Sequence, residues 1–432
     1  MVEYLKSAPG LPPQSAGDTA DTVQIMLARL REGREEAVRE YAAKLDGWEG
    51  EIVVSPEQIE QAALHVSDPL KAEIRYAHDN IRRFAEAQRA SAMDFETELR
   101  PGLFAGQRQI PLNAAGCYVP GGRYAHIASA LMTITTARAA GVPNITACSP
   151  PRAGQGVHPA ILYAMSLAGA DRILAVGGVQ GVAAMAFGLF GAPEADILVG
   201  PGNQFVAEAK RQLFGPVGID MFAGPTDSLV IADRSADALT VAWDLVGQAE
   251  HGYNSPVWLV LDDADLAEQV LINIPGCIKE LPEPNRSSAQ AAWDALGEVI
   301  LCENREEMAQ VADRYAPEHL HVQAAELDWW KGRLNAYGSL FLGANTTVAF
   351  GDKASGPNHV LPTSGAARYT GGLSVHKYLK TVTWQRVEDQ ALPALARATA
   401  AISRAEGMEG HARTADIRLD GGQAALRAVG NG

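Results

Sequence analysis

Residues 144–176 read NITACSPPRAGQGVHPAILYAMSLAGADRILAV, and this stretch decides the fold class. Its apolar runs at 144–148 and 172–176 predict buried strands, and the periodic apolar residues at 159–168 predict a helix between them. Strands that alternate with helices of this length indicate a parallel sheet with helices on both faces.

The same alternation extends in both directions along the chain. Helices are predicted at 127–140, 181–190 and 204–214, and strands at 196–199 and 229–232. A second α/β stretch covers 237–350, with strands at 257–261, 299–302 and 339–342. Residues 1–17 are rich in Pro, Gly and Ser and predict an N-terminal arm, followed by helical patterns at 22–45 and 56–90. After about residue 380 the pattern is mostly helical, with a strand-like piece at 414–418, and predicts a C-terminal appendage.

Composition excludes several classes of function. The 36 basic and 51 acidic side chains among 432 residues give a net charge of −15, which argues against a nucleic acid as partner. An anionic substrate would therefore need a local cluster of positive groups. Four widely spaced cysteines fit a reducing compartment and buried thiols. Without a signal-peptide pattern or a long apolar run, we expect a cytoplasmic protein that does not contact a membrane.

Glycine-rich turns follow several predicted strands, at 119–122, 177–181 and 200–203. Each opens a predicted helix and offers backbone N–H groups to an anion or a nucleotide. The alternative is that they are only tight turns between a strand and a helix. None is a GxGxxG with an acidic residue about 20 positions later, so the common dinucleotide fingerprint is absent.

Polar side chains suited to metal binding and acid–base chemistry occur in four segments. Gln248 and His251 are three residues apart, so a helix continuing from 237–245 would place both on one face, as two ligands of one metal require. Such a pair also occurs on ordinary helix surfaces. Glu318 and His319 are a carboxylate beside an imidazole, and need an irregular segment to serve one site, because neighbours in regular structure diverge. The mixed nitrogen and oxygen donors that suit Zn²⁺ or a similar ion are Gln248, His251, Asp352 and His411.

Several motifs occur in a characteristic order: GCYVPGG at 116–122, GPGN at 200–203, AGPT at 223–226, QAEH at 248–251, APEHL at 316–320, GD at 351–352, SGPNHVLPT at 355–363, and Glu406 ahead of His411. From about residue 20 to the C-terminus, the chain thereby resembles the histidinol dehydrogenase family. The resemblance implies a zinc enzyme that oxidises a primary alcohol to a carboxylate in two NAD-dependent hydride transfers. It also implies a homodimer whose C-terminal segment is exchanged with the partner.

The resemblance implies two incomplete Rossmann-like domains as well. The first comprises 18–117 with 228–373 and holds the metal and catalytic residues, the second comprises 118–227 on the NAD side, and 374–432 forms the C-terminal dimerisation segment. The implied zinc ligands are Gln248, His251, Asp352 and His411, and the implied acid–base pair is Glu318 and His319. The implied NAD contacts are Tyr118, Gln180 and Asn203, and the implied substrate contacts are Thr226, His359 and Glu406.

The chain departs from the biosynthetic pattern of that family at two places. Arg123 and His126 stand where small or apolar residues are expected, and Lys377 stands in a segment that is usually acidic. New positive groups would repel histidinol, which is a cation, and suit an anion. With GANTTVAFGD at 343–352 and GGLSVHK at 371–377, the pattern resembles the sulfopropanediol 3-dehydrogenase branch, which oxidises (R)-2,3-dihydroxypropane-1-sulfonate to (R)-sulfolactate. We therefore expect Arg123, His126 and Lys377 to bind the sulfonate, with solvated loop charges as the alternative.

Two other functions remain as alternatives. The first is histidinol dehydrogenase itself, which Glu406 and His359 favour; Thr226 stands where Ser is expected in that enzyme. The second is a non-catalytic metal-binding scaffold, which a broken motif would favour, and no motif is broken here. Mn²⁺ remains an alternative to Zn²⁺, and NADP an alternative to NAD.

Overall fold

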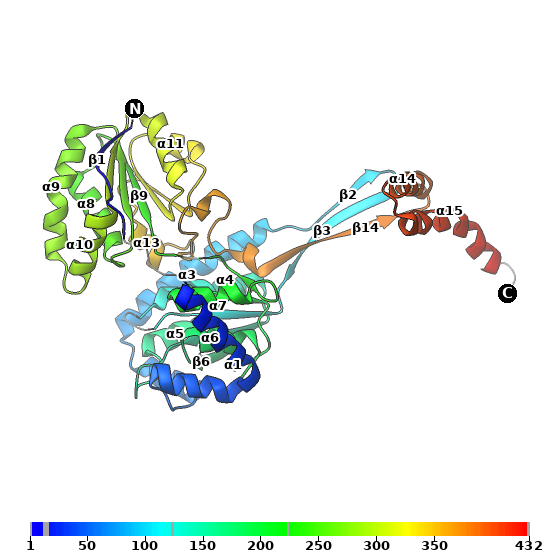
Figure 1. Ribbon diagram of the computed structural model, residues 1–432, viewed down its shortest axis with the longest axis horizontal. Coiled ribbons are helices and arrows are strands. Elements are labelled where there is room, and N and C mark those ends of the chain that lie inside the picture. Colours follow the sequence, from blue (N-terminus) through cyan, green and yellow to red (C-terminus); the bar gives the residue numbers. More distant parts are fainter. Residues whose placement is uncertain (1, 12–16, 122–124, 223, 430–432) are drawn as a thin grey trace. The chain divides into compact units, whose positions relative to one another are not determined.

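The structure is a computed structural model that describes residues 2–11, 17–121, 125–222 and 224–429 (Figure 1). Its contacts divide the chain into two compact units. Unit 1 comprises Met1–Arg89 and Leu112–Tyr378, and unit 2 comprises Ala90–Pro111 and Leu379–Gly432. Unit 1 contains two sheets, each with its own helices, and unit 2 contains a third sheet and two helices.

The larger sheet of unit 1 has six strands. Their order is β1 (Glu3–Lys6), β11 (Glu298–Leu301), β10 (Val257–Leu261), β9 (Ser228–Ala232), β12 (His319–Gln323) and β13 (Ser339–Leu342). All neighbours are parallel except β1, which pairs antiparallel with β11. One face is covered by α8 (Ala238–Ala249), α9 (Ala264–Glu280) and α10 (Asn285–Leu296), and the other by α11 (Arg305–Tyr315) and α12 (Leu327–Arg333) (Figure 1). The strands β9 and β10 are therefore buried on both faces, which explains why their sequences are apolar almost throughout.

The second sheet of unit 1 has five parallel strands. Their order is β6 (Arg172–Ala175), β5 (Asn144–Ser149), β4 (Ala114–Tyr118), β7 (Ile197–Val199) and β8 (Gly218–Ile219). Three helices share one core with this sheet: α1 (Gly17–Tyr41), α6 (Gly178–Ala186) and α7 (Gln204–Leu213). Contacts to β4 and β5 also come from α4 (Ile127–Ala140), which packs against α5 (Pro159–Ala168). The strands and helix predicted over 144–176 are thus confirmed.

The remaining elements of unit 1 are short or lie beside these two sheets. They are the π-helical turn η1 (Ala42–Asp46), α2 (Pro56–Leu64), α3 (Asp68–Ser91), α13 (Val348–Lys353), and the 3₁₀ turns η2 (Ala366–Arg368) and η3 (Val375–Tyr378). The last two residues of α3 belong to unit 2. Ser55 begins α2 with a capping box, in which its side chain accepts from the Gln58 backbone N–H and the Gln58 side chain accepts from the Ser55 N–H.

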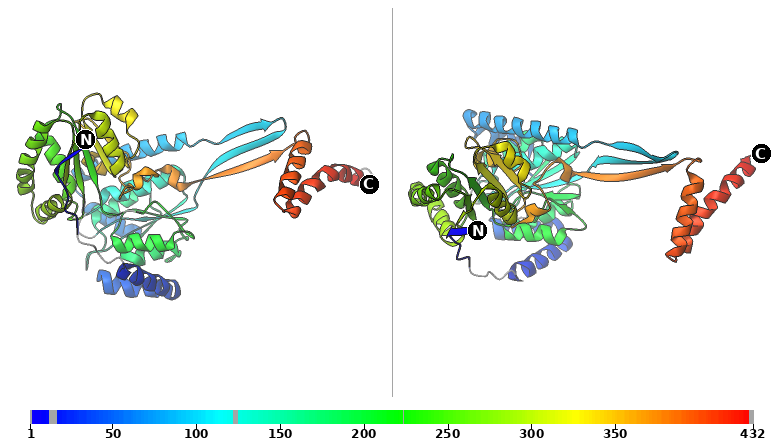
Figure 2. Two further views of the ribbon diagram at one scale, coloured as in Figure 1. Left: turned by 45° about the horizontal axis from the view of Figure 1, so that its top comes forward. Right: turned by 90° about the horizontal axis from the view of Figure 1, so that it is seen from above.

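Unit 2 is built from a three-stranded antiparallel ribbon and two helices (Figure 2). The strand order is β14 (Leu379–Val387), β3 (Leu103–Pro111) and β2 (Phe95–Arg100), and the helices are α14 (Leu392–Ala405) and α15 (Glu409–Val429). The helices pack through alanines, with Ala396 and Ala400 of α14 against Ala412 and Ala415 of α15. The strand expected at 414–418 is therefore wrong: this segment lies within α15.

The structure also groups residues differently from the expected domains. The helix α1 packs on the five-stranded sheet rather than with 228–373, because Val23, Leu27 and Leu30 face the core of that sheet. The predicted arm contains β1, which adds an edge strand to the other sheet. The C-terminal segment contains β14 as well as helices, and it shares unit 2 with 90–111.

The structure bears on two expectations, one about the cysteines and one about membrane-spanning segments. All four cysteines are buried and none forms a disulfide, as predicted from their spacing. None of the helices in the described part of the chain combines the length and the apolar character that crossing a bilayer demands.

Candidate active site

The candidate catalytic and metal-binding residues gather at the amino-terminal edge of the six-stranded sheet. His319 is the first residue of β12 and pairs with Ser228, the first residue of β9. Gln248 lies in the last turn of α8, and His251 lies in the turn between α8 and β10. The helix thus ends before His251, and the pair does not share one helical face as expected. A segment that follows a helix and precedes a parallel strand returns to the amino edge, whereas ligands of open α/β sheets usually bind at the carboxyl edge.

Glu318 and His319 converge because the backbone before β12 is irregular. Ala316 ends α11 in the left-handed region with φ of +48°, Pro317 follows, and Glu318 lies outside the strand that His319 begins. The Glu318 Oε2 atom lies 3.7 Å from His319 Nδ1, and both side chains are buried. The irregular segment that an adjacent acid–base pair requires is therefore present.

Asp227 holds this pair in place through backbone and side-chain contacts. Its carboxylate accepts hydrogen bonds from the N–H of Glu318 at 2.7 Å and of Ser364 at 3.0 Å. Its carbonyl oxygen lies 3.3 Å from His319 Nδ1, so this nitrogen donates to it. Thr226 donates its hydroxyl proton to Glu318 Oε2 at 2.5 Å. Sequence reasoning missed Asp227, although it directly follows Thr226.

Burial and neighbouring charges shift the proton affinities of both residues. Burial raises the pKa of Glu318 to about 7, although His319 and the Thr226 hydroxyl favour its ionised form. Burial alone would lower the pKa of His319, but the negative charges of Glu318 and Asp352 outweigh it and raise the pKa to about 9. Asp352 Oδ1 lies 3.5 Å from His319 Nε2, which is an electrostatic contact rather than a hydrogen bond. His319 Nε2 therefore has no hydrogen-bond partner among the described residues.

Three of the four expected metal ligands lie in unit 1. His251 Nε2 is 3.8 Å from Asp352 Oδ2, in α13. Burial opposes ionisation of Asp352, but His319 and the other nearby imidazoles lower its pKa to about 2, so it is a carboxylate. Gln248 is buried, and its Oε1 accepts no hydrogen bond within the described ranges. One imidazole, one carboxylate and one unpaired amide oxygen suit a divalent cation such as zinc.

This donor set is incomplete within unit 1. In the part of the chain that the structure describes, no three His, Cys, Asp or Glu side chains lie close enough together to hold a metal ion. The fourth expected ligand, His411, is an exposed residue of α15 in unit 2, and Glu406 follows α14 in the same unit, also exposed. Their roles stay predictions.

A cavity of about 320 Å³ adjoins the metal-binding residues. It is lined by Ala125, His126, Ile127, Ala128, Ser129, Glu250, His251, Asn285, Lys353 and His359. His359 donates from Nδ1 to the Asp352 carbonyl at 3.0 Å and accepts at Nε2 from the Ser129 hydroxyl at 3.0 Å. Burial lowers the pKa of His359 to about 4, so its ring is neutral. His359 and His126, both expected substrate contacts, therefore line one cavity.

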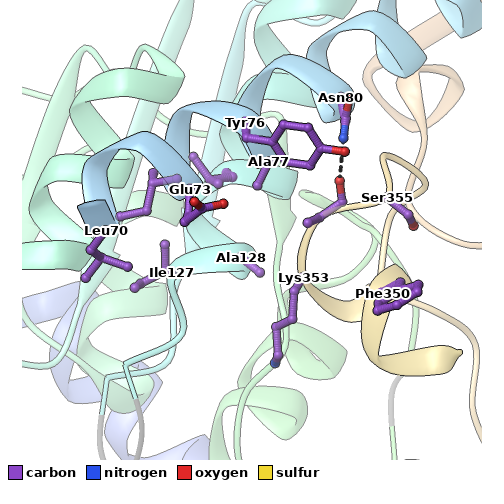
Figure 3. Close-up of a pocket in the computed structure, with 13 residues that line it drawn as sticks. Leu70, Glu73, Tyr76, Ala77, Asn80, Ile127, Ala128, Phe350, Lys353 and Ser355 are labelled. Atoms are coloured by element: carbon purple, nitrogen blue, oxygen red, sulfur yellow. Dashed lines mark hydrogen bonds between the residues drawn. The ribbon is translucent and has the colours of Figure 1, made fainter. Parts of the chain in front are cut away.

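A second, more apolar cavity of about 520 Å³ shares Ile127, Ala128 and Lys353 with the first (Figure 3). It lies between α3, the start of α4 and the end of α13. Asn80 of α3 donates to the carbonyl of Ala354 at 2.9 Å, which ties α3 to the segment after α13 (Figure 3). Lys353 was not singled out by the sequence reasoning, although it directly follows a predicted metal ligand.

The expected nucleotide contacts lie at the carboxyl edge of the five-stranded sheet. Tyr118 ends β4, and its hydroxyl accepts from the N–H of Gly178 at 3.1 Å. Asn203 caps α7 by accepting from two backbone N–H groups, each at 3.1 Å. Gly200 has φ of +110°, and a Cβ there would lie 2.0 Å from the Tyr118 carbonyl oxygen, so only glycine fits this turn. The turns after β4, β6 and β7 therefore meet around Tyr118.

Gln180 is hydrogen-bonded to Asp46, a residue that belongs to none of the motifs. Its Nε2 donates to Asp46 Oδ2 at 3.0 Å, and the same oxygen accepts from the N–H of Gly177 at 3.3 Å. Gln180 is buried, and its Oε1 has no hydrogen-bond partner among the residues described. Asp46 ends the N-terminal helical region, so no local pattern connects it with this turn.

The remaining sulfonate contacts are only partly brought together. Lys377 lies in η3, with its Nζ 3.4 Å from Thr370 Oγ1, and it is not among the described residues that line the 320 Å³ cavity. Arg123 lies outside the described residues. Of the three basic residues expected at the sulfonate, His126 is the one placed at the cavity.

The sequence profile that describes histidinol dehydrogenases matches residues 12–419 of this chain. The chain belongs to the histidinol dehydrogenase family. It is 81% identical over 431 residues to a histidinol dehydrogenase homolog of Ruegeria pomeroyi, with 100% of each chain covered. It is 63% identical over 418 residues to the sulfopropanediol 3-dehydrogenase of that organism, with 97% of this chain and 96% of the other covered.

A solved structure gives the same result for the fold. The crystal structure of histidinol dehydrogenase from Elizabethkingia anophelis superimposes with a TM-score of 0.90 at 34% identity, covering 96% of this chain and 95% of the other. The expected family membership and α/β fold are thus confirmed, and the protein is a member of a dehydrogenase family.

Proposed function

We propose that this histidinol dehydrogenase family member is a zinc-dependent, NAD-linked alcohol dehydrogenase. Its substrate would be (R)-2,3-dihydroxypropane-1-sulfonate and its product (R)-sulfolactate, formed by two successive hydride transfers through an aldehyde. The observation that carries the proposal is the buried pair Glu318 and His319, which lies beside Asp352. His251 in turn lies next to Asp352 and lines the 320 Å³ cavity. The 63% identity to a sulfopropanediol 3-dehydrogenase supports the substrate.

His319 is the group that would take the proton of the substrate hydroxyl. Its Nδ1–H is directed to the Asp227 carbonyl, which orients the ring and leaves the buried Nε2 as the proton acceptor. Gln248, His251 and Asp352 would hold the zinc, which would supply the Lewis acidity that lowers the pKa of an alcohol, and NAD would supply the hydride acceptor. A cation near Asp352 would also offset the negative charge that raises the pKa of His319.

Glu318 is suited to the second oxidation. An aldehyde becomes a carboxylate only after water adds to it, so one water and two NAD yield two NADH and three protons in the overall reaction. A carboxyl group with a pKa of about 7 is a base close to neutral pH, and it can take a proton from the attacking water. Thr226 and the Asp227 N–H, at 2.5 and 3.2 Å from Oε2, hold that oxygen in position.

One observation favours the alternative, the oxidation of L-histidinol. Glu250 is the carboxylate among the described residues lining the cavity, and a cationic substrate could pair with it. However, its Oε2 already accepts a hydrogen bond from Asn285 Nδ2 at 2.8 Å. Lys353, which also lines the cavity, is a cation and suits an anionic substrate better than a cationic one.

The test is NADH formation by zinc-loaded enzyme with racemic 2,3-dihydroxypropane-1-sulfonate or with L-histidinol. Two NADH per sulfonate consumed, with histidinol inert, is the expected result. Turnover of histidinol alone would overturn the proposal in favour of the biosynthetic reaction. If neither compound is oxidised by enzyme that binds zinc, a metal-binding scaffold becomes the better account.

The proposal includes a homodimer in which the C-terminal segment brings His411 and Glu406 to the partner's site. Mixing inactive His411→Ala and Glu318→Gln homodimers tests it after subunit exchange. Heterodimers would contain one intact site and one doubly altered site, so roughly a quarter of wild-type activity should return. If each chain supplies its own His411, mixing restores nothing.

A further inference from the structure

Lys353 of unit 1 lies at the boundary of two adjoining cavities. It is the last residue of α13, directly after Asp352, and it lines the 320 Å³ cavity. It also lines the adjoining apolar cavity (Figure 3). The residue is exposed, and no hydrogen bond or ion pair joins its ammonium group to another described residue. Most other charges near the site are bonded: Asp227, Glu318 and Glu250 each accept hydrogen bonds.

The histidines of the cavity do not supply a fixed positive charge. His126, His251 and His359 are imidazoles, which carry a positive charge only when they are protonated, and His359 accepts at Nε2 from the Ser129 hydroxyl at 3.0 Å. A lysine side chain, by contrast, presents an ammonium group with three hydrogen-bond donors. Lys353 is therefore the cationic side chain among the described residues that line the 320 Å³ cavity.

We infer that Lys353 binds the anionic end of the substrate and selects small alcohols that carry a sulfonate over neutral or cationic ones. Consecutive Cα atoms are about 3.8 Å apart, so this ammonium is tethered beside the predicted metal ligand Asp352. A three-carbon substrate with its reacting hydroxyl at one end and its charge at the other matches that arrangement. The inference rests on the proposed function and replaces Lys377, which contacts Thr370 instead of lining the cavity.

The first test compares Lys353→Met with Lys331→Met, a matched loss of one exposed lysine at the end of α12, away from the cavity. A charge-assisted contact predicts a KM for 2,3-dihydroxypropane-1-sulfonate that is roughly 10- to 100-fold higher in Lys353→Met, with kcat nearly unchanged. Lys331→Met should match wild type. Glycerol lacks the anionic group, so its kcat/KM should be equal in all three proteins. A KM for the sulfonate unchanged by Lys353→Met would overturn the inference, as would an equal loss with glycerol.

A binding measurement separates this inference from the proposed function. Calorimetric titration of 2,3-dihydroxypropane-1-sulfonate into zinc-loaded enzyme without NAD requires no turnover. Loss of binding in Lys353→Met and Lys353→Gln, with retention in Lys353→Arg and Lys331→Met, would support the inference. If wild type binds the sulfonate without oxidising it, the proposed function fails while this comparison still decides the role of Lys353. Absence of binding to wild type would overturn the inference.

Discussion

The hydroxyl of Thr226 should set the pH at which Glu318 becomes a base. Thr226 Oγ1 donates to Glu318 Oε2 at 2.5 Å in a buried environment, which favours the ionised carboxylate. A hydrogen bond to a charged group contributes about 1.5–3 kcal/mol, and about 1.4 kcal/mol corresponds to one pKa unit. Thr226→Val removes the donor while keeping the shape, so the pKa of Glu318 should rise from about 7 by roughly one to two units.

The assay is the pH dependence of kcat for NADH formation between about pH 5 and pH 10. A higher pKa keeps the proton on Glu318 to higher pH, so the rising acid limb of Thr226→Val should move to more alkaline pH. Thr226→Ser retains the hydroxyl and should retain the wild-type limb, which controls for small changes of packing. A Thr226→Val profile that superimposes on wild type would refute the assignment of this limb to Glu318.

Other predictions concern the structural support of the site. Lys210→Met leaves Asp220, its buried partner at 2.5 Å, without a cation, so it should lower the free energy of unfolding in urea by about 3–5 kcal/mol. Lys210→Met combined with Asp220→Leu should regain much of that loss, and an unchanged urea midpoint in the single variant would contradict this account. Asp244 of α8 accepts from Gln323 of β12 at 2.6 Å and from Thr347 before α13 at 2.8 Å, linking the elements that carry Gln248, His319 and Asp352. Asp244→Ala should weaken zinc binding roughly 10- to 100-fold in competition with a chromophoric chelator, and wild-type affinity would rule out this supporting role. Dialysis against a chelator should abolish NADH formation and added zinc should restore it; full activity after metal removal would exclude a metal requirement.

The parts of the fold that sequence patterns predicted are those whose signal is local. Residues 144–176 predict strand, helix and strand because a buried parallel strand is apolar along its whole length. The strand β2 has no such pattern, because all its residues are exposed and its ribbon is completed by β14, far along the chain. At 414–418 the local preference of Thr and Ile for strands is overridden by alanine packing between α14 and α15.

The sequence by itself determined the family, the α/β class and the chemical types at the site, because motif order and side-chain chemistry can be read without coordinates. Only the tertiary structure decided that Glu318, His319 and Asp352 converge at the amino edge of the six-stranded sheet. It also decided that Asp227 and Asp46 hold the expected residues in place and that Lys353 lines the cavity. These properties depend on distances between segments tens to hundreds of residues apart and on the burial that their packing creates, and burial together with nearby charge shifts the pKa of Glu318 and His319.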